Sequence, residues 1–193
     1  MPPKAKFVKE EIIQAAMDIV REDGVQALTA RALGSRLGSS ARPIFTIFQS
    51  MDEVQKEVIN ASRELYKQYT KDCLGQPSAF MCIGKQYVQF ASKEPKLFQL
   101  LFMTEKGNVP DLSGILPLLD DSYAEILLSI KKEYGIGDRE AKRFYQHLWI
   151  YTHGIAILCA TKMCILTEGE IEQMIYEVGE SLLKKMWSDS QRE

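Results

Sequence analysis

The sequence has few of the residues and motifs on which most enzymes and metalloproteins depend. It contains two histidines and four cysteines in 193 residues, and the cysteines at positions 73, 82, 159 and 164 form no C-x-x-C pair. We therefore expect no zinc site and four reduced thiols. Cysteines 159 and 164 would point about 140° apart on a helix, so a disulfide between them is not expected either.

Signatures of catalysis are absent as well. The sequence has no G-x-S-x-G, no phosphate-binding loop, no G-x-G-x-x-G and no H-E-x-x-H. The adjacent acids Asp120 and Asp121 would point about 100° apart on a helix, which makes them a poor acid–base pair. The sequence predicts neither an enzyme nor a bound cofactor or metal.

No apolar run is long enough to span a membrane. The longest, 148–160, is interrupted by Thr152, His153 and Gly154, and the lysine-containing N-terminus lacks the apolar stretch of a secretory signal. We therefore expect a cytoplasmic protein with no membrane partner.

Strand-like alternation is also missing, whereas apolar residues recur at helical spacing along the whole chain. The sequence thus predicts an all-α fold. Its helices are expected at 10–23, 30–37, 41–48, 52–74, 78–93, 96–103, 112–134 with an interruption or restart at Pro117, 138–166 and 167–187. We place a three-helix DNA-binding domain at 1–51 and a larger helical domain for effector binding and dimerisation at 52–193.

The stretch 29–48 has the pattern of a helix-turn-helix, and we call it the recognition stretch. Thr29 is a good N-cap for a helix over 30–37, and Gly38 ends that helix. A second short helix follows over 41–48, where Pro43 is tolerated because a first-turn residue has no helical N–H bond to lose. Helices paired in this way insert the second one into the DNA major groove.

All charged residues in the recognition stretch are basic. Between positions 24 and 50 there is no acidic residue, but Arg31, Arg36 and Arg42 give about +3 in a chain whose formal net charge is −2. A local basic surface on an acidic protein predicts a polyanionic partner for that surface. The alternative is a plain helical hairpin with solvated arginines.

The first 54 residues resemble the DNA-binding domain of the tetracycline-repressor (TetR) family. The resemblance lies in a helix ending at Gly24, Ala27-Leu28-Thr29, the 30–37 helix, Ser40, Ile44-Phe45-x-x-Phe48 and Asp52-Glu53-Val54. Where that family commonly has a tyrosine, a histidine or tyrosine, and a lysine on DNA phosphates, this chain has Phe45, Ile47 and Met51. More of the binding would then rest on the remaining candidates.

The resemblance implies a sequence-specific transcriptional regulator, a ligand-responsive repressor that binds a palindromic operator as a homodimer. Residues expected to contact double-stranded DNA are Lys4, Lys6, Thr29, Arg31, Ser39, Ser40, Arg42, Pro43, Phe45 and Thr46. Lys4 and Lys6 form either a phosphate-binding arm or a solvated tail. The alternative function is a helical ligand-binding or protein-interaction dimer whose DNA-binding head is weak or unused.

The family resemblance also implies a small, often hydrophobic, effector in the C-terminal domain. Candidate pocket residues are Tyr87, Phe98, Phe102, Met103, Tyr123, His147 and Tyr151, although each of them could equally be plain core. We expect the effector to rotate the 52–74 helix and so to change the separation of the two recognition stretches.

A homodimer is predicted independently from the last two helices. Between 144 and 166 the only charged residue is Lys162, so apolar residues lie on all sides of that helix, and a helix that is apolar all round must be covered all round. Two such helices from each subunit form a twofold four-helix bundle. Expected interface residues are Ile155, Leu158, Ile171, Ile175, Val178 and Leu182.

Overall fold

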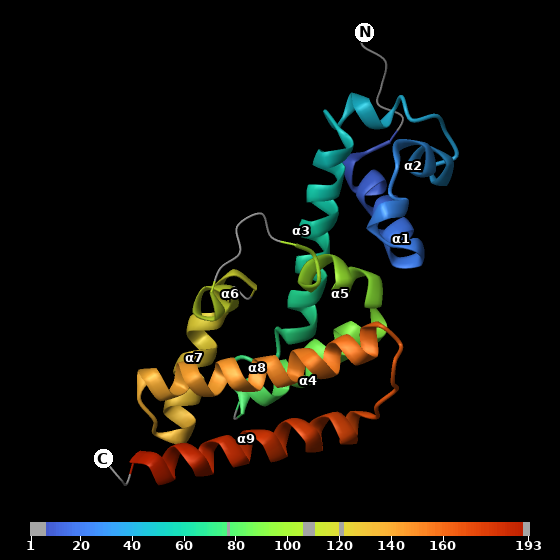
Figure 1. Ribbon diagram of the computed structural model, residues 1–193. Coiled ribbons are helices and arrows are strands. Elements are labelled where there is room, and N and C mark those ends of the chain that lie inside the picture. The colour runs from blue at the N-terminus through green and yellow to red at the C-terminus, as the bar shows by residue number, and fades with distance from the viewer. Residues whose placement is uncertain (1–6, 77, 106–110, 120–121, 191–193) are drawn as a thin grey trace. The chain divides into compact units, whose positions relative to one another are not determined.

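Helical periodicity governs the whole of the described chain. The computed structural model describes residues 7–76, 78–105, 111–119 and 122–190, and these residues form helices and connecting turns without any strand (Figure 1). The all-α prediction is confirmed.

The described residues divide into two compact units. The first runs to Lys67 and includes Glu94–Thr104, whereas the second comprises Gln68–Lys93 and the described residues from Glu105 onward. Helix α3 (Met51–Thr70) therefore begins in the first unit and ends in the second. The first unit extends beyond the boundary expected at residue 51, and the functions assigned to 1–51 and 52–193 stay predictions.

The first unit is built on α1 (Lys9–Asp23), which contacts η1 (Val25–Ala27), α2 (Ala30–Arg36) and α5 (Pro95–Phe102). Ile12, Ala16 and Val20 recur at helical spacing and are fully buried, so one face of α1 forms the centre of this core. The ammonium of Lys9 lies 2.6 Å from the Glu57 carboxylate of α3.

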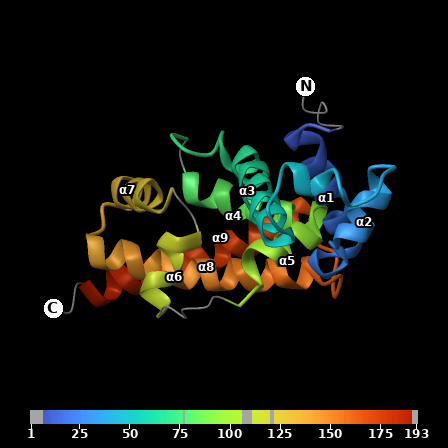
Figure 2. The same cartoon turned by 90° about the horizontal axis from the view of Figure 1, so that it is seen from above.

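The second unit is built on α4 (Ala79–Lys93), which packs against α7 (Tyr123–Tyr134), α8 (Asp138–Ala160) and α9 (Glu168–Ser190). The short α6 (Leu112–Leu119) contacts α7 and α8. Helices α8 and α9 run side by side in opposite directions (Figure 2). Their antiparallel pairing follows from the short connection between them.

Several helix ends differ from the predicted ones, and α3 ends at Thr70 rather than at residue 74. The expected break within 112–134 is present, but its predicted position is wrong: Pro117 lies inside α6, and α7 begins at Tyr123. Helix α8 ends at Ala160, because Lys162 adopts a positive φ of 58° and the Met163 N–H turns back to the Leu158 carbonyl at 3.0 Å.

Thr167, with Glu170 three residues later, predicts a capping box at the start of α9, and the hydrogen bonds there confirm it. The Glu170 N–H donates to the Thr167 hydroxyl at 3.3 Å, and the Thr167 N–H donates to the Glu170 carboxylate at 2.7 Å. These bonds also hold the pKa of Glu170 below its ordinary value.

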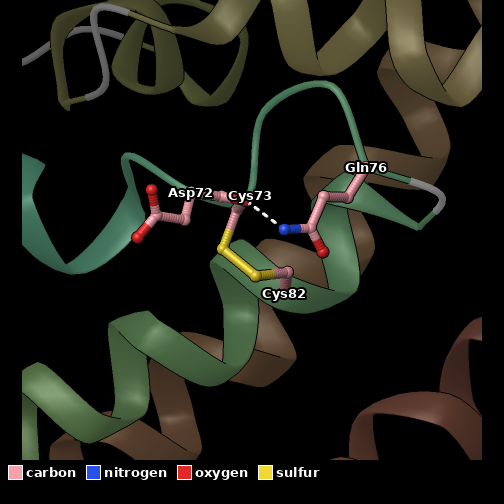
Figure 3. Close-up of a disulfide and its surroundings, with 4 residues drawn as sticks. All are labelled: Asp72, Cys73, Gln76 and Cys82. Carbon is pink, nitrogen blue, oxygen red and sulfur yellow. Dashed lines mark hydrogen bonds between the residues drawn. A yellow bond between two sulfur atoms is a disulfide. The ribbon is translucent and has the colours of Figure 1, made fainter.

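Cysteine pairing differs from the sequence prediction. Cys73 and Cys82 form a disulfide with their Cα atoms 5.4 Å apart, so the expectation of reduced thiols is wrong for this pair (Figure 3). The chain reverses between α3 and α4, which brings together two residues that no C-x-x-C spacing marks. Cys159 and Cys164 are free, as expected.

Candidate functional site

The start and end of α2 follow directly from the sequence. The Thr29 hydroxyl accepts a hydrogen bond from the Ala32 N–H at 3.1 Å, which confirms the predicted N-cap. Gly38 lies in the left-handed region with φ 62°, and the Ser39 N–H donates to the Gly34 carbonyl at 2.9 Å. This hydrogen bond ends the helix, and the following turn runs back across α2.

That turn packs directly on the backbone of α2 at Gly34. A Cβ at this position would lie 2.9 Å from both the Ala41 nitrogen and the Ser40 carbonyl carbon. Only a glycine allows so close an approach, because those atoms belong to the backbone and cannot rotate away. The direction of the chain that leaves the turn is thereby fixed.

The expected second helix is the main correction in this region. Instead of an α-helix over 41–48, the structure has a single 3₁₀ turn, η2 (Ile44–Thr46). Pro43 disfavours helical backbone at the preceding Arg42, and the β-branched Ile44, Thr46 and Ile47 are weak helix formers. The four-residue spacing of Ile44 and Phe48 predicts a shared inward face, and both side chains are indeed buried, with 0% and 1% exposure.

Most of the predicted DNA contacts lie at the surface. Six are exposed, namely Thr29, Arg31, Ser40, Arg42, Phe45 and Thr46, whereas Ser39 and Pro43 are half-buried. Lys4 and Lys6 lie outside the described residues. A polyanion would therefore meet one short, acid-free stretch of chain.

The three arginines of this stretch are not equivalent. Arg36 makes two hydrogen bonds to the Glu22 carboxylate, one of them at 2.9 Å from Nη1 to Oε1. These bonds hold the pKa of Glu22 below its ordinary value, so the pair is fully charged and self-compensating at neutral pH. Within the described chain, Arg31 and Arg42 form no ion pair. The positive charge left for a partner resides on those two residues.

Two threonines of the recognition stretch also differ in which side-chain groups remain available to a partner. The Thr46 hydroxyl donates to the Pro43 carbonyl at 2.6 Å, so its proton is already used and its methyl group is what remains. Thr29 uses its oxygen only as an acceptor, and its O–H is left to donate. Thr29 suits a phosphate oxygen, whereas Thr46 suits an apolar contact such as a thymine methyl.

The predicted pocket residues fall into two groups. Phe98, Phe102 and Met103 belong to the first unit, whereas the other four, Tyr87, Tyr123, His147 and Tyr151, belong to the second. Neither unit by itself gathers all seven. His147 is exposed, while Phe98 and Tyr87 are buried core residues.

The sequence named His147 as a candidate pocket residue, but in the structure it is His153 that packs among aromatic side chains. Its Nδ1 lies 2.8 Å from the Tyr87 hydroxyl, and the Trp149 ring stacks on it at 4.7 Å between ring centroids. Burial lowers the pKa of His153 below its ordinary value. Because α8 is apolar on all sides, its periodicity did not indicate which histidine faces inward.

A cavity of about 190 Å³ lies within the second unit, between α4, α7 and α9. Aromatic and apolar side chains dominate its lining, with a charge pair between Glu180 and Lys184 at 2.9 Å. The lining residues are Ser78, Phe80, Met81, Tyr134, Tyr176, Gly179, Glu180, Leu183, Lys184 and Trp187. Burial raises the pKa of Tyr134 far above its ordinary value, so its phenol stays protonated.

Sequence reasoning missed this cavity altogether. None of its ten lining residues is among the seven pocket candidates, because three of its aromatic residues, Tyr134, Tyr176 and Trp187, are far apart along the chain. The available signal was the presence of aromatic residues on otherwise polar faces of α7 and α9. Pockets of this kind bind small ligands through apolar walls and a few polar groups.

The expected interface residues divide by burial. Ile155, Ile171 and Ile175 are 1–3% exposed, so they are core residues with no surface left for a partner. Leu158 is 38% exposed, and Val178 and Leu182 are half-buried. On the same helix as Leu158, Ile150 is 46% exposed and Gly154 has open space above it.

Metal and membrane chemistry find no support in the described chain. No group of three or more histidine, cysteine, aspartate or glutamate side chains within it is arranged to hold a metal ion. None of its helices combines the length and apolarity needed to cross a bilayer.

Comparison with solved structures is informative, whereas comparison with sequences is not. No protein-family model and no curated protein matches the sequence. A crystal structure of a transcriptional regulator from Rhodococcus sp. Rha1 is similar, with a TM-score of 0.63 and 17% identity over 91% of this chain and 96% of that chain. The chain therefore shares the helical fold of that regulator over nearly its whole length.

Proposed function

We propose that this protein is a sequence-specific, DNA-binding transcriptional regulator that acts as a homodimer and responds to a small ligand. The observation that carries the proposal is the acid-free recognition stretch, in which Arg31 and Arg42 are exposed and form no ion pair within the described chain. The fold shared with a known transcriptional regulator supports the same function. As a DNA-binding protein it would work in the cytoplasm.

Arg42 is the best candidate to read a base. It lies in the turn directly before η2, and a guanidinium pairs in two hydrogen bonds with the O6 and N7 of guanine. Arg31 and the Thr29 hydroxyl suit phosphate oxygens, which position the protein without reading sequence. Phe45, 46% exposed, supplies an apolar surface where the TetR family commonly has a polar phosphate contact.

Dimerisation through α8 and α9 supplies the second recognition stretch. Ile150, Gly154 and Leu158 form an exposed apolar row on α8, while Val178 and Leu182 on α9 retain accessible surface. A twofold pair of such helices would place two recognition stretches on successive major grooves of a palindrome. Sedimentation of Leu158→Glu, which buries a charge in this interface, is expected to show monomers where the parent chain forms dimers.

We propose the cavity between α4, α7 and α9 as the effector site. Its aromatic walls suit a small, mainly apolar or aromatic molecule, since about 190 Å³ leaves no room for a larger one. An effector that binds the DNA-incompetent state with only about 1.4 kcal/mol more free energy would weaken DNA binding tenfold. In Trp149→Phe, Trp187 is the sole remaining tryptophan, so its fluorescence would report occupancy by small phenols and aromatic amines.

Selection from random double-stranded DNA, at about 50 and about 200 mM salt, tests the central proposal. We expect a palindrome enriched at both salts, and loss of that enrichment in the Arg31→Ala, Arg42→Ala double variant. Arg36→Ala is the matched control, because its guanidinium is already compensated by Glu22. Absence of any enriched sequence in the dimeric, ligand-free protein would contradict the proposal.

The alternative is a helical ligand-binding or protein-interaction dimer with an unused head. Phe45, Ile47 and Met51 favour it, because they replace polar phosphate contacts of the TetR family with apolar side chains. Salt-independent behaviour in the selection would support this alternative, whereas a twofold-symmetric selected sequence would exclude it.

A further inference from the structure

The Cys73–Cys82 disulfide joins the segment directly after the long helix α3 to the start of α4 in the second unit. Cys73 follows the end of α3 by three residues, and Cys82 is in the first turn of α4 (Figure 3). Helix α4 packs in turn against α7, α8 and α9. The bond therefore fixes the end of α3 to a helix that packs against three others of that unit.

Noncovalent contacts also hold this junction. The Cys73 N–H donates to the Thr70 carbonyl at 3.0 Å, and the Gln76 side-chain amide donates to the Asp72 carbonyl at 2.6 Å. The N–H and hydroxyl of Ser78 donate to the Glu133 carboxylate of α7 at 2.9 and 2.7 Å. Between the helices, the Tyr69 ring meets the Phe90 ring edge-on at 5.4 Å. Breaking the disulfide would remove the covalent cross-link of this junction and leave these noncovalent contacts to hold it.

Small thiols can reach the bond. Both cysteines line a cleft of about 430 Å³ whose walls are otherwise mostly polar, namely Gln68, Tyr69, Asp72, Gln76, Gln86, Gln89 and Lys93. Cys82 is partly exposed, whereas Cys73 is 1% exposed. Attack from solvent is thus directed at the Cys82 sulfur, with the Cys73 sulfur as the leaving group.

In a thiol-reducing compartment a disulfide of this kind suits regulation. This step rests on the proposed function, because that function places the protein in such a compartment. A regulator that binds DNA works in a thiol-reducing compartment, where a disulfide is not retained merely for stability. Disulfides in such compartments are usually transient and act in catalysis or redox sensing. No catalytic machinery accompanies this pair within the described residues.

We propose that Cys73 and Cys82 form a reversible thiol–disulfide switch that fixes the end of α3 to α4 when oxidised and releases it when reduced. A thiolate of a low-molecular-weight thiol such as glutathione attacks the Cys82 sulfur, and the Cys73 thiolate leaves and takes up a proton. A second thiol attacks the outer sulfur of the mixed disulfide, which releases the Cys82 thiol and one molecule of the oxidised thiol. Glutathione disulfide drives the same exchange in reverse.

Oxidation is expected to strengthen DNA binding. α3 starts five residues after η2, so its orientation sets the orientation of the recognition stretch attached to it. To bind two half-sites of a palindrome, a dimer must hold both copies of α3 in one orientation. A covalent link at the end of α3 lowers the conformational entropy cost of fixing that orientation. We expect affinity for the selected DNA to fall about three- to tenfold on reduction.

The experiment poises the full-length, undenatured protein in glutathione buffers that cover several decades of thiol-to-disulfide ratio. Alkylation followed by mass spectrometry counts free thiols, and hydrogen exchange reports on residues 68–82. We expect two additional thiols to appear reversibly, exchange over 68–82 to quicken, and Tm to fall by roughly 5–10 °C. Cys73→Ser combined with Cys82→Ser should reproduce the reduced state in every buffer, and Cys164→Ser is the matched control that keeps the switch.

Three outcomes would overturn the proposal. These are a bond that opens only in denaturant, four free thiols at every ratio, or a reduced protein whose hydrogen exchange over 68–82 equals that of the oxidised one. DNA affinity is measured separately in each buffer. If neither redox state binds DNA, the proposed function fails, whereas the switch is still judged by the thiol count and the exchange rates.

Discussion

Two glycines, one in each unit, differ in how closely neighbouring atoms pack against them. Gly34 in the first unit meets backbone atoms of the next turn, which would lie 2.9 Å from an added Cβ. Gly179 in the second unit lines the cavity, and an added Cβ there would lie 3.9 Å from the Phe144 ring, an ordinary contact. The recognition stretch is held without spare room, whereas the second unit keeps space beside an aromatic core.

This difference suits two different tasks. A surface that reads DNA must keep its geometry, because a misplaced guanidinium loses its paired hydrogen bonds to a base. A ligand site must admit a molecule that is sometimes absent, and rings that meet edge-on around a cavity can do so. In the second unit Phe80, Tyr134 and Phe144 form such a group, with centroids 5.3–5.7 Å apart.

The largest expected effect tests the aromatic group. Phe144→Ala removes a fully buried ring that contacts both Phe80 and Tyr134, so we expect the free energy of unfolding to fall by about 3–5 kcal/mol. Phe144→Leu, which retains more of the volume, should cost clearly less. Urea denaturation followed by circular dichroism measures both, and equal losses would mean that the ring itself is unimportant.

The two glycines give the next effect, with opposite signs. Gly34→Ala is expected to destabilise the protein by about 1–3 kcal/mol, because the turn backbone must move away from α2. Gly179→Ala lies mid-helix and its added Cβ would make only ordinary contacts, so the gain in helix propensity should stabilise the protein by up to about 1 kcal/mol. Thermal denaturation of the two variants decides whether the contrast holds.

Binding to the selected DNA provides a comparison within the recognition stretch. Arg42→Ala is expected to lose about 1–3 kcal/mol of binding free energy and to relax preference at one base position. Arg36→Ala should lose less, because Glu22 already compensates its charge. Fluorescence anisotropy titrations at fixed salt measure both, and equal losses would show that Arg36 leaves Glu22 when DNA binds.

The smallest expected effect concerns pH and His153 of α8. Burial places the native-state pKa of His153 below the unfolded value of about 6.5. The unfolded chain therefore binds a proton first, and the stability present above that pH is lost as pH falls through it. We expect His153→Gln to flatten the dependence of Tm on pH between 7.5 and 5.5, as measured by thermal denaturation across that range.

Short-range signals accounted for what the sequence predicted well. The cap at Thr29, the break at Gly38 and the box at Thr167 each depend on neighbours a few residues away, so the helix ends they set could be read from the chain. The 3₁₀ turn at Ile44–Thr46 was missed because apolar spacing of four residues fits one helical turn as well as it fits a longer helix.

Features that depend on tertiary packing could not be predicted in the same way. Helix α8 is apolar on all sides, so its sequence did not distinguish His147 from His153, nor Ile155 in the core from Leu158 at the surface. The Cys73–Cys82 bond depends on how tightly the chain reverses between two helices. The cavity depends on residues from three helices, which no local pattern connects.

Pairing of Arg36 with Glu22 has a consequence for counterion release. Each phosphate that a protein neutralises contributes about 0.9 to the slope of log affinity against log salt. A dimer in which Arg31 alone neutralises phosphate would show a slope near −1.8 from these residues, whereas one in which Arg36 did so as well would approach about −3.6. A single carboxylate on α1 therefore makes this surface more tolerant of ionic strength than its sequence charge implies.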